Sequence, residues 1–149
     1  ALLVEVQSLA TSSANNNPLR RTTGLDHTRA AMLTAVTERA ARIKLWDKDV
    51  YLATVAGAKV SDPGADLAMC LALTSSARDQ AISDDVVAIG EVALSGDVRP
   101  VPGMSQRIAE AARLGFNTAI VPRSTKKSVQ TSGITLIEVA NLGQALSHI

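Results

Sequence analysis

The sequence predicts a single domain of the mixed α/β (α+β) class. Short runs with apolar residues at every second position, typical of half-buried strands, are intermixed with longer runs whose apolar residues recur at helical spacing. The chain has 149 residues, a length that fits one domain, and 46% of them are hydrophobic, which is enough to build a core. Neither an internal repeat nor an interdomain linker is visible. We therefore interpret residues 1–149 as one domain.

Strands and helices alternate in the first half of the chain. In the first strand, Val4, Val6 and Leu9 alternate with polar neighbours. A polar, asparagine-rich loop follows, and Asp26 is a suitable N-cap for the first helix because its carboxylate can accept free amide hydrogens. The predicted strands are Leu2–Leu9, Leu19–Gly24 and Asp49–Ala56, and the predicted helices begin at Asp26 and at Asp62 or Pro63.

The two helices of this half carry apolar faces that are expected to point inward. On the first helix these residues are Met32, Leu33, Val36, Ala40 and Ile43. On the second they are Leu67, Cys70, Leu71 and Thr74. Cys70 is the only cysteine, so an internal disulfide is excluded, and its apolar surroundings predict a buried thiol.

The second half begins with a predicted hairpin. Val92, Leu94, Val98 and Val101 alternate around a turn at Ser95–Asp97, so all four are expected to face the core. The predicted elements are strands at Val86–Leu94 and Val98–Val101, a helix at Gly103–Leu114, a strand at Thr118–Pro122, a basic loop at Arg123–Gly133, a strand at Ile134–Val139 and a helix at Leu142–Ile149.

Composition and motifs exclude several classes of site. A net charge of +1 gives no overall attraction to nucleic acid or to a membrane, and no apolar run reaches the ~18 residues of a membrane span. His27 and His148 have no partners at metal-ligand spacing, and no phosphate-binding loop is present. We therefore expect no cofactor and no metal in this chain.

Two segments resemble the proteolytic domain of Lon proteases: Asp62–Ala68 (DPGADLA) and Gly90–Gly103 (GEVALSGDVRPVPG). That family uses a Ser-Lys dyad. The resemblance places Gly64 where the serine would stand and Ser105 where the lysine would stand. Glycine carries no nucleophile, and serine is no amine base. The resemblance therefore implies the Lon-protease-like, ribosomal protein S5 domain 2-like fold without catalytic residues.

The order of the segments further resembles the C-terminal domain of the bacterial RadA/Sms recombination proteins. Segments that carry the resemblance are Leu3–Leu9, Pro18–Asp26, Asp49–Tyr51, Asp62–Ala68, Gly90–Gly103 and Ala111–Pro122. The resemblance implies a fragment of a longer cytoplasmic bacterial protein, whose zinc finger and RecA-like ATPase lie outside this chain. It also implies ATP, magnesium and zinc for the whole protein, assembly into a hexameric ring, and branch migration on single-stranded or branched DNA in recombination and repair. A recombinase is a further candidate partner, and no membrane is expected.

Basic residues are the candidates for contact with DNA, because lysine and arginine bind phosphates without sequence preference. The predicted contacts are the pairs Arg20–Arg21 and Lys126–Lys127, beside a further cluster of Arg39, Arg42, Lys44 and Lys48. The alternative is an ordinary solvated surface, since acidic residues lie near several of them. No aromatic platform for stacking single-stranded bases is visible in the sequence.

Three alternatives remain open. Asp62–Asp66 with Ser105 is consistent with a vestigial dyad site, to which Asp66 adds negative charge, and equally with a plain helix start capped by Asp62. ComM-like and magnesium-chelatase-related ATPases carry a similar inactive domain with a Gly-Glu-x-x-Leu-x-Gly segment, so they are a second possible parent. An active serine protease would need another pair, and the local ones are Lys59 with Ser61, and Lys126 or Lys127 with Ser124 or Ser128.

Overall fold

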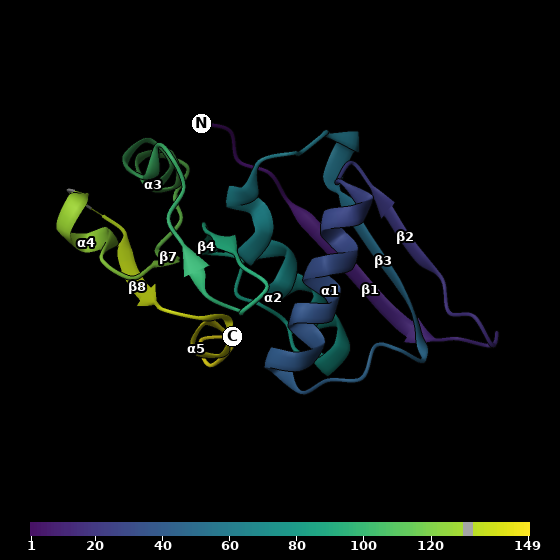
Figure 1. Cartoon of the computed structure of the whole chain (residues 1–149). Coiled ribbons are helices and arrows are strands. Elements are labelled where there is room, and N and C mark those ends of the chain that lie inside the picture. The colour runs from purple at the N-terminus through teal and green to yellow at the C-terminus, as the bar shows by residue number, and fades with distance from the viewer. Residues whose placement is uncertain (130–132) are drawn as a thin grey trace.

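Two three-stranded sheets and the helices between and outside them form successive layers in the computed structural model, which describes residues 1–129 and 133–149 (Figure 1). The strands are β1 (Val6–Ser12), β2 (Arg20–Thr23), β3 (Lys48–Thr54), β4 (Val86–Ala88), β5 (Glu91–Val92), β6 (Val98–Arg99), β7 (Thr118–Pro122) and β8 (Thr135–Val139). The helices are α1 (His27–Ala41), α2 (Asp66–Arg78), α3 (Met104–Arg113), α4 (Thr125–Ser128) and α5 (Leu142–Leu146), with 3-10 turns η1 (Val55–Gly57) and η2 (Pro63–Ala65).

The first sheet has the order β1-β3-β2, with β1 antiparallel and β2 parallel to the central β3. Val50, Leu52 and Thr54 alternate along β3 and are buried, as the sequence predicts. They face α1 and α2, which lie on one side of the sheet (Figure 1). The strand order makes β1 and β2 the edge strands. The face of the sheet away from α1 and α2 carries exposed residues such as Leu9 and Arg21.

Helix α1 begins after Asp26, as the sequence predicts, whereas α2 begins only at Asp66, after the 3-10 turn η2 that Asp62 caps. The Asp26 carboxylate accepts from the amide of Arg29 at 3.1 Å, and the Asp62 carboxylate accepts from the amide of Gly64 at 2.8 Å. The four residues expected on the inner face of α2 are all buried: Leu67, Cys70, Leu71 and Thr74. Burial raises the pKa of the Cys70 thiol to about 12, so this sulfur behaves as a small apolar group.

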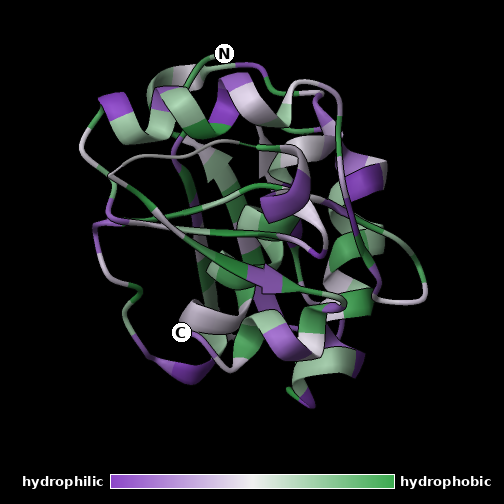
Figure 2. Cartoon of the chain, turned by 90° about the vertical axis from the view of Figure 1, so that its left-hand side faces the viewer, coloured by the Kyte–Doolittle hydropathy of each residue, from purple (hydrophilic) through white to green (hydrophobic). Residues whose placement is uncertain are grey.

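The second sheet has the order β4-β7-β8, and all its strands are parallel. The central strand β7 is buried on both faces, because Ile120 packs toward α1 and α2 whereas Ala119 and Val121 pack toward α3. In Figure 2, which views this second sheet from its outer side, hydrophobic stretches run through the strands and hydrophilic ones fall mainly on peripheral helices and loops. A fully covered parallel strand needs such a continuous apolar sequence.

The prediction for the first strand is wrong in two respects: the residues at which the strand begins and ends, and the expectation that Leu9 shares a face with Val6. The strand runs from Val6 to Ser12 rather than from Leu2. Val6 and Ala10 are half-buried, and Leu9 is 57% exposed because it lies on the opposite face from them. Strand alternation has a period of two, so Val6 and Leu9 cannot share a face.

The predicted hairpin is shorter than expected, and Leu94 is not part of the core. Strand β4 pairs with β7 instead of continuing into the hairpin, which consists of β5 and β6. Val92 and Val98 are paired and buried, but Leu94 is 74% exposed. It lies in the turn that the Ala93 carbonyl closes by accepting from Gly96, so its side chain extends outward.

The basic segment Arg123–Gly133 contains a helical turn, α4, where the sequence predicts only a loop. Part of that predicted loop, residues 130–132, lies outside the described residues. The strand predicted at Thr118–Pro122 is confirmed. The left-handed backbone predicted for Gly115 at the end of α3 is also confirmed, with a φ of 95°.

Candidate functional site

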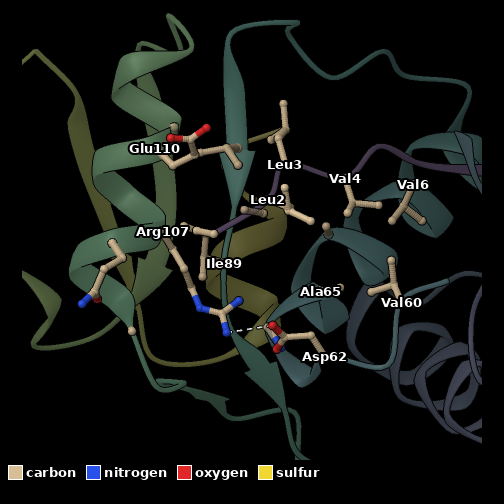
Figure 3. Close-up of a pocket in the computed structure, with 18 of the residues that line it drawn as sticks. Leu2, Leu3, Val4, Val6, Val60, Asp62, Ala65, Ile89, Arg107 and Glu110 are labelled. Carbon is tan, nitrogen blue, oxygen red and sulfur yellow. Dashed lines mark hydrogen bonds and ion pairs between the residues drawn. The ribbon is translucent and has the colours of Figure 1, made fainter. Parts of the chain in front are cut away.

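A groove of about 520 Å³ lies between the start of α2, the start of α3 and the N-terminal segment. Its walls are mostly apolar, and Figure 3 shows Leu2, Leu3 and Val4 passing along one side of it. Among the residues labelled in Figure 3, the polar ones come from two places: Asp62 before α2, and Arg107 with Glu110 on α3. The groove therefore joins the two segments in which the sequence places the degenerate dyad.

Gly64 is buried at the base of this groove. Its amide donates to the Asp62 carboxylate at 2.8 Å, and its carbonyl accepts from the Gly90 amide at 3.1 Å. A Cβ atom built on Gly64 would lie 2.7 Å from Nη1 of Arg107 and 3.1 Å from Oδ1 of Asp62. The space for a side chain at the position predicted for a nucleophile is therefore filled by a guanidinium.

Two polar contacts hold the Arg107 side chain in that space. Nη2 of Arg107 pairs with Oδ2 of Asp62 at 2.7 Å, as the dashed line in Figure 3 marks, and Nε donates to the Pro102 carbonyl at 3.0 Å. Partial burial acts to raise the pKa of the Asp62 carboxyl. The hydrogen bonds from Gly64 and Arg107 outweigh it, so the pKa stays below its ordinary value. The carboxylate is therefore charged at neutral pH and committed to its partners.

Ser105, at the position predicted for the dyad lysine, is exposed on α3. Gln106 and Arg107 line the groove in its place. Lys59 and Ser61 both lie on the exposed rim. Among the hydrogen bonds described for residues 1–129 and 133–149, none joins these two side chains.

Placing a serine at Gly64 is expected to destabilise the fold by up to about 1 kcal/mol, because the end of the flexible Arg107 side chain must move and give up its partly exposed ion pair. The penalty should shrink when Gly64→Ser is made in an Arg107→Ala background, where the space is empty. Urea unfolding of the four proteins of this double-mutant cycle measures the coupling. The Arg113→Ala background is the matched control, since Arg113 pairs with Glu110 elsewhere on α3. An equal penalty in the Arg107→Ala and Arg113→Ala backgrounds would contradict the steric account.

Asp66 does not add charge to the groove, contrary to one interpretation of the sequence. Its side chain is fully buried, and Oδ1 accepts from Nε of Arg29 at 2.6 Å while Oδ2 accepts from Nη2 of Arg29 and, at 3.0 Å, from the amide of Val92. The hydrogen bonds that Arg29 donates to Asp66 are the main cause that raises the pKa of Arg29, against the effect of desolvation. Asp66 thus ties α1, α2 and β5 together.

The two arginines of the basic pair on β2, Arg20 and Arg21, have different surroundings. The Arg20 guanidinium donates to the Leu45 carbonyl at 2.6 Å and to the Lys48 carbonyl, so it braces the loop between α1 and β3. Arg21, the next residue along the strand, lies on the opposite face of the sheet and is exposed. Of this pair, only Arg21 therefore presents its side chain to solvent.

The other predicted pair lies on α4, where Lys126 and Lys127 are both exposed. The amide of Lys126 donates to the Glu138 carboxylate of β8 at 3.0 Å, which fixes the helix over the strand. Figure 1 shows α4 and β2 at opposite sides of the molecule. A single chain therefore does not bring the two pairs together.

The remaining basic residues lie at the end of α1, in the loop that follows it and at the start of β3. They are Arg39, Arg42, Lys44 and Lys48, and the same loop carries Trp46, which is 67% exposed. Sequence reasoning passed over Trp46, as it did Arg29 and Arg107. The signal for Trp46 was a large aromatic residue inside a charged loop. The partners of the two arginines are distant in sequence and give no local signal.

The described part of the chain holds no group of three histidine, cysteine, aspartate or glutamate side chains close enough to bind a metal ion. None of its helices has the length and apolar character needed to cross a membrane.

Comparison with known proteins places this architecture in a family. The family model of the Lon protease (S16) C-terminal proteolytic domain matches residues 26–145. Over 146 residues, 98% of this chain, it is 43% identical to the DNA repair protein RadA of Escherichia coli K12 and covers 32% of that protein. It is 45% identical to RadA of Pseudomonas aeruginosa over 148 residues, with 99% of this chain and 33% of that protein covered. It is 40% identical to RadA of Bacillus subtilis over 146 residues, with 97% and 32% covered. The chain thus spans about a third of the length of these relatives.

Proposed function

This chain belongs to the Lon protease (S16) C-terminal proteolytic domain family, and from that premise we propose that it is a non-catalytic Lon-like scaffold domain of a RadA-type DNA repair protein. One observation carries the proposal: the nucleophile position is Gly64, and the Arg107 guanidinium fills the space a side chain would need. The lysine position is the exposed Ser105. The similarity to RadA proteins favours this parent over a ComM-like one.

The proposal for the whole protein extends further. A motor domain outside this chain would bind and hydrolyse ATP with magnesium, and a zinc finger would accompany it. Six copies would form a ring in the bacterial cytoplasm that drives branch migration during recombination and repair of damaged DNA, with a recombinase as a further partner. This domain would support the ring and contact single-stranded or branched DNA.

Peptidase activity is expected to stay at background, because the groove offers neither a serine hydroxyl at Gly64 nor an amine base at Ser105. The measurement is release of fluorescent peptides from unfolded casein by the purified chain. Ser61→Ala and Lys59→Ala are the matched variants, since these residues form the one Lys-Ser pair on the groove rim suggested by the sequence. Turnover that either variant abolishes would overturn the non-catalytic role.

Contact with DNA is expected to be electrostatic and without sequence preference. Arg21→Ala and the double variant Lys126→Ala/Lys127→Ala should each weaken binding to a fluorescent single strand and reduce the slope of affinity against salt. Each removed phosphate contact lowers the slope by about 0.7 for a single strand. Arg113→Ala is the control, because it removes one charge from a side chain already paired with Glu110. An unchanged slope in both test variants would exclude these residues as phosphate contacts.

A further inference from the structure

The loop between α1 and β3 presents an unusual combination of side chains. Trp46 is 67% exposed, and it is the only tryptophan in the chain. The nearby cations Arg42 and Lys44 are exposed as well. Figure 1 shows this segment along the lower edge of the molecule, well away from the groove beside α3. A large apolar ring left in water forgoes the stabilisation that its burial would bring.

The loop is tied to the rest of the domain by hydrogen bonds, although its tryptophan is largely exposed. The Glu38 carboxylate accepts from the amide of Leu45 at 2.6 Å, and the amide of Lys48 donates to the Leu45 carbonyl at 3.1 Å. The Arg20 guanidinium donates to the carbonyls of Leu45 and Lys48, on either side of the tryptophan. Leu45 itself is completely buried and anchors the loop in the core. The ring of Trp46 is therefore presented outward by a hydrogen-bonded backbone.

The charges around the ring favour a polyanion. The exposed basic side chains are Arg39, Arg42 and Lys44, with Lys48 half-buried. The neighbouring acids are Glu38, Asp47 and Asp49, so the four basic residues exceed them by one charge. Glu38 and Asp49 are half-buried and accept from the backbone amides of Leu45 and Leu19, whereas Asp47 is exposed. The centres of protein interfaces are depleted of lysine, whereas single-stranded nucleic acid is bound by cations beside an aromatic ring that stacks on a base.

We propose that Trp46 is a base-stacking contact for single-stranded DNA, with Arg42 and Lys44 neutralising the flanking phosphates and Arg20 acting as a positioning residue for the loop. This site rests on the proposed function of the chain as a DNA-binding domain and adds the mode and place of contact. It differs from the basic pairs on β2 and α4, which carry charge but no exposed aromatic ring. A π-face stacks on any base, so the contact tolerates every sequence.

Because Trp46 is the only tryptophan, its own fluorescence reports the contact. The experiment titrates the 149-residue chain at low salt with a dT oligonucleotide and with an abasic oligonucleotide of equal length, which keeps the phosphates and lacks the bases. Stacking predicts quenching by the dT strand and markedly less by the abasic strand. Trp46→Ala should weaken binding to labelled dT by at least about fivefold, and Trp46→Phe by less. Leu94→Ala, which removes another exposed apolar side chain, should leave the affinity unchanged.

The outcomes separate this site from the proposed function. Binding of dT by the unmodified chain, with the same affinity in Trp46→Ala, would overturn the stacking site and leave a DNA-binding role in place. Absence of any binding at low salt would overturn both. If Trp46→Ala changed the sedimentation coefficient and not the DNA affinity, the ring would instead contact a second copy, and the proposal would be wrong. Equal quenching by dT and abasic strands would also overturn it.

Discussion

Arg29→Ala is expected to destabilise the domain by about 2–4 kcal/mol, because it leaves the fully buried Asp66 carboxylate without its ionic partner. Arg29 is itself 31% exposed, which places the expected value below that of a completely buried pair. The Val92 amide would remain as a donor to Asp66, but one neutral hydrogen bond does not offset the cost of a desolvated charge. Urea denaturation at neutral pH measures the loss.

Two variants test the cause of that loss. Asp66→Asn in the Arg29→Ala background removes the unpaired charge and retains an acceptor for Val92, so it should recover part of the stability. Arg113→Ala breaks an exposed pair with Glu110 and should leave the unfolding midpoint almost unchanged. An Arg29→Ala midpoint equal to that of Arg113→Ala would mean that Asp66 is not a buried charge in solution.

Leu33→Ala is expected to cost about 2–5 kcal/mol, whereas Leu94→Ala should stay within about 0.5 kcal/mol of the unmodified chain. The two substitutions delete the same atoms. Leu33 is completely buried on α1 between the two sheets, and Leu94 is 74% exposed in the hairpin turn. Thermal or urea unfolding compares the two directly. Similar losses would show that Leu94 packs against the core after all.

Much of the fold was predictable because it depends on local patterns. The cap at Asp26, the inner face of α2 and the strand Thr118–Pro122 each follow from residues close together in sequence, and each is confirmed. Leu94 was predicted wrongly, because alternation does not reveal where a strand gives way to a turn. The sequence also did not show that Val86–Leu94 is divided into the two strands β4 and β5. The partner of β4 is β7, some 30 residues further along the chain, and no local pattern encodes that pairing.

The candidate site shows the same division between local and distant signals. The sequence located Gly64 and Ser105 through motif resemblance, but it could not show which side chain enters the groove. Arg107 does so because α3 points it at Asp62, across a separation that no short pattern encodes. Arg20 looked like a surface cation, and its guanidinium instead donates to two backbone carbonyls. Such contacts depend on tertiary structure, which brings distant segments together.

The contact between Gly64 and Arg107 also restricts the evolutionary routes open to this domain. A lineage that gained a serine at Gly64 while Arg107 remained would lose stability before it could gain any chemistry. It would still lack a base, because Ser105 points into solvent. The Arg107 side chain would have to move aside or be replaced, and either change sacrifices the ion pair with Asp62. The effect of a serine at Gly64 on stability thus depends on the residue at position 107, which is epistasis between two positions far apart in the sequence.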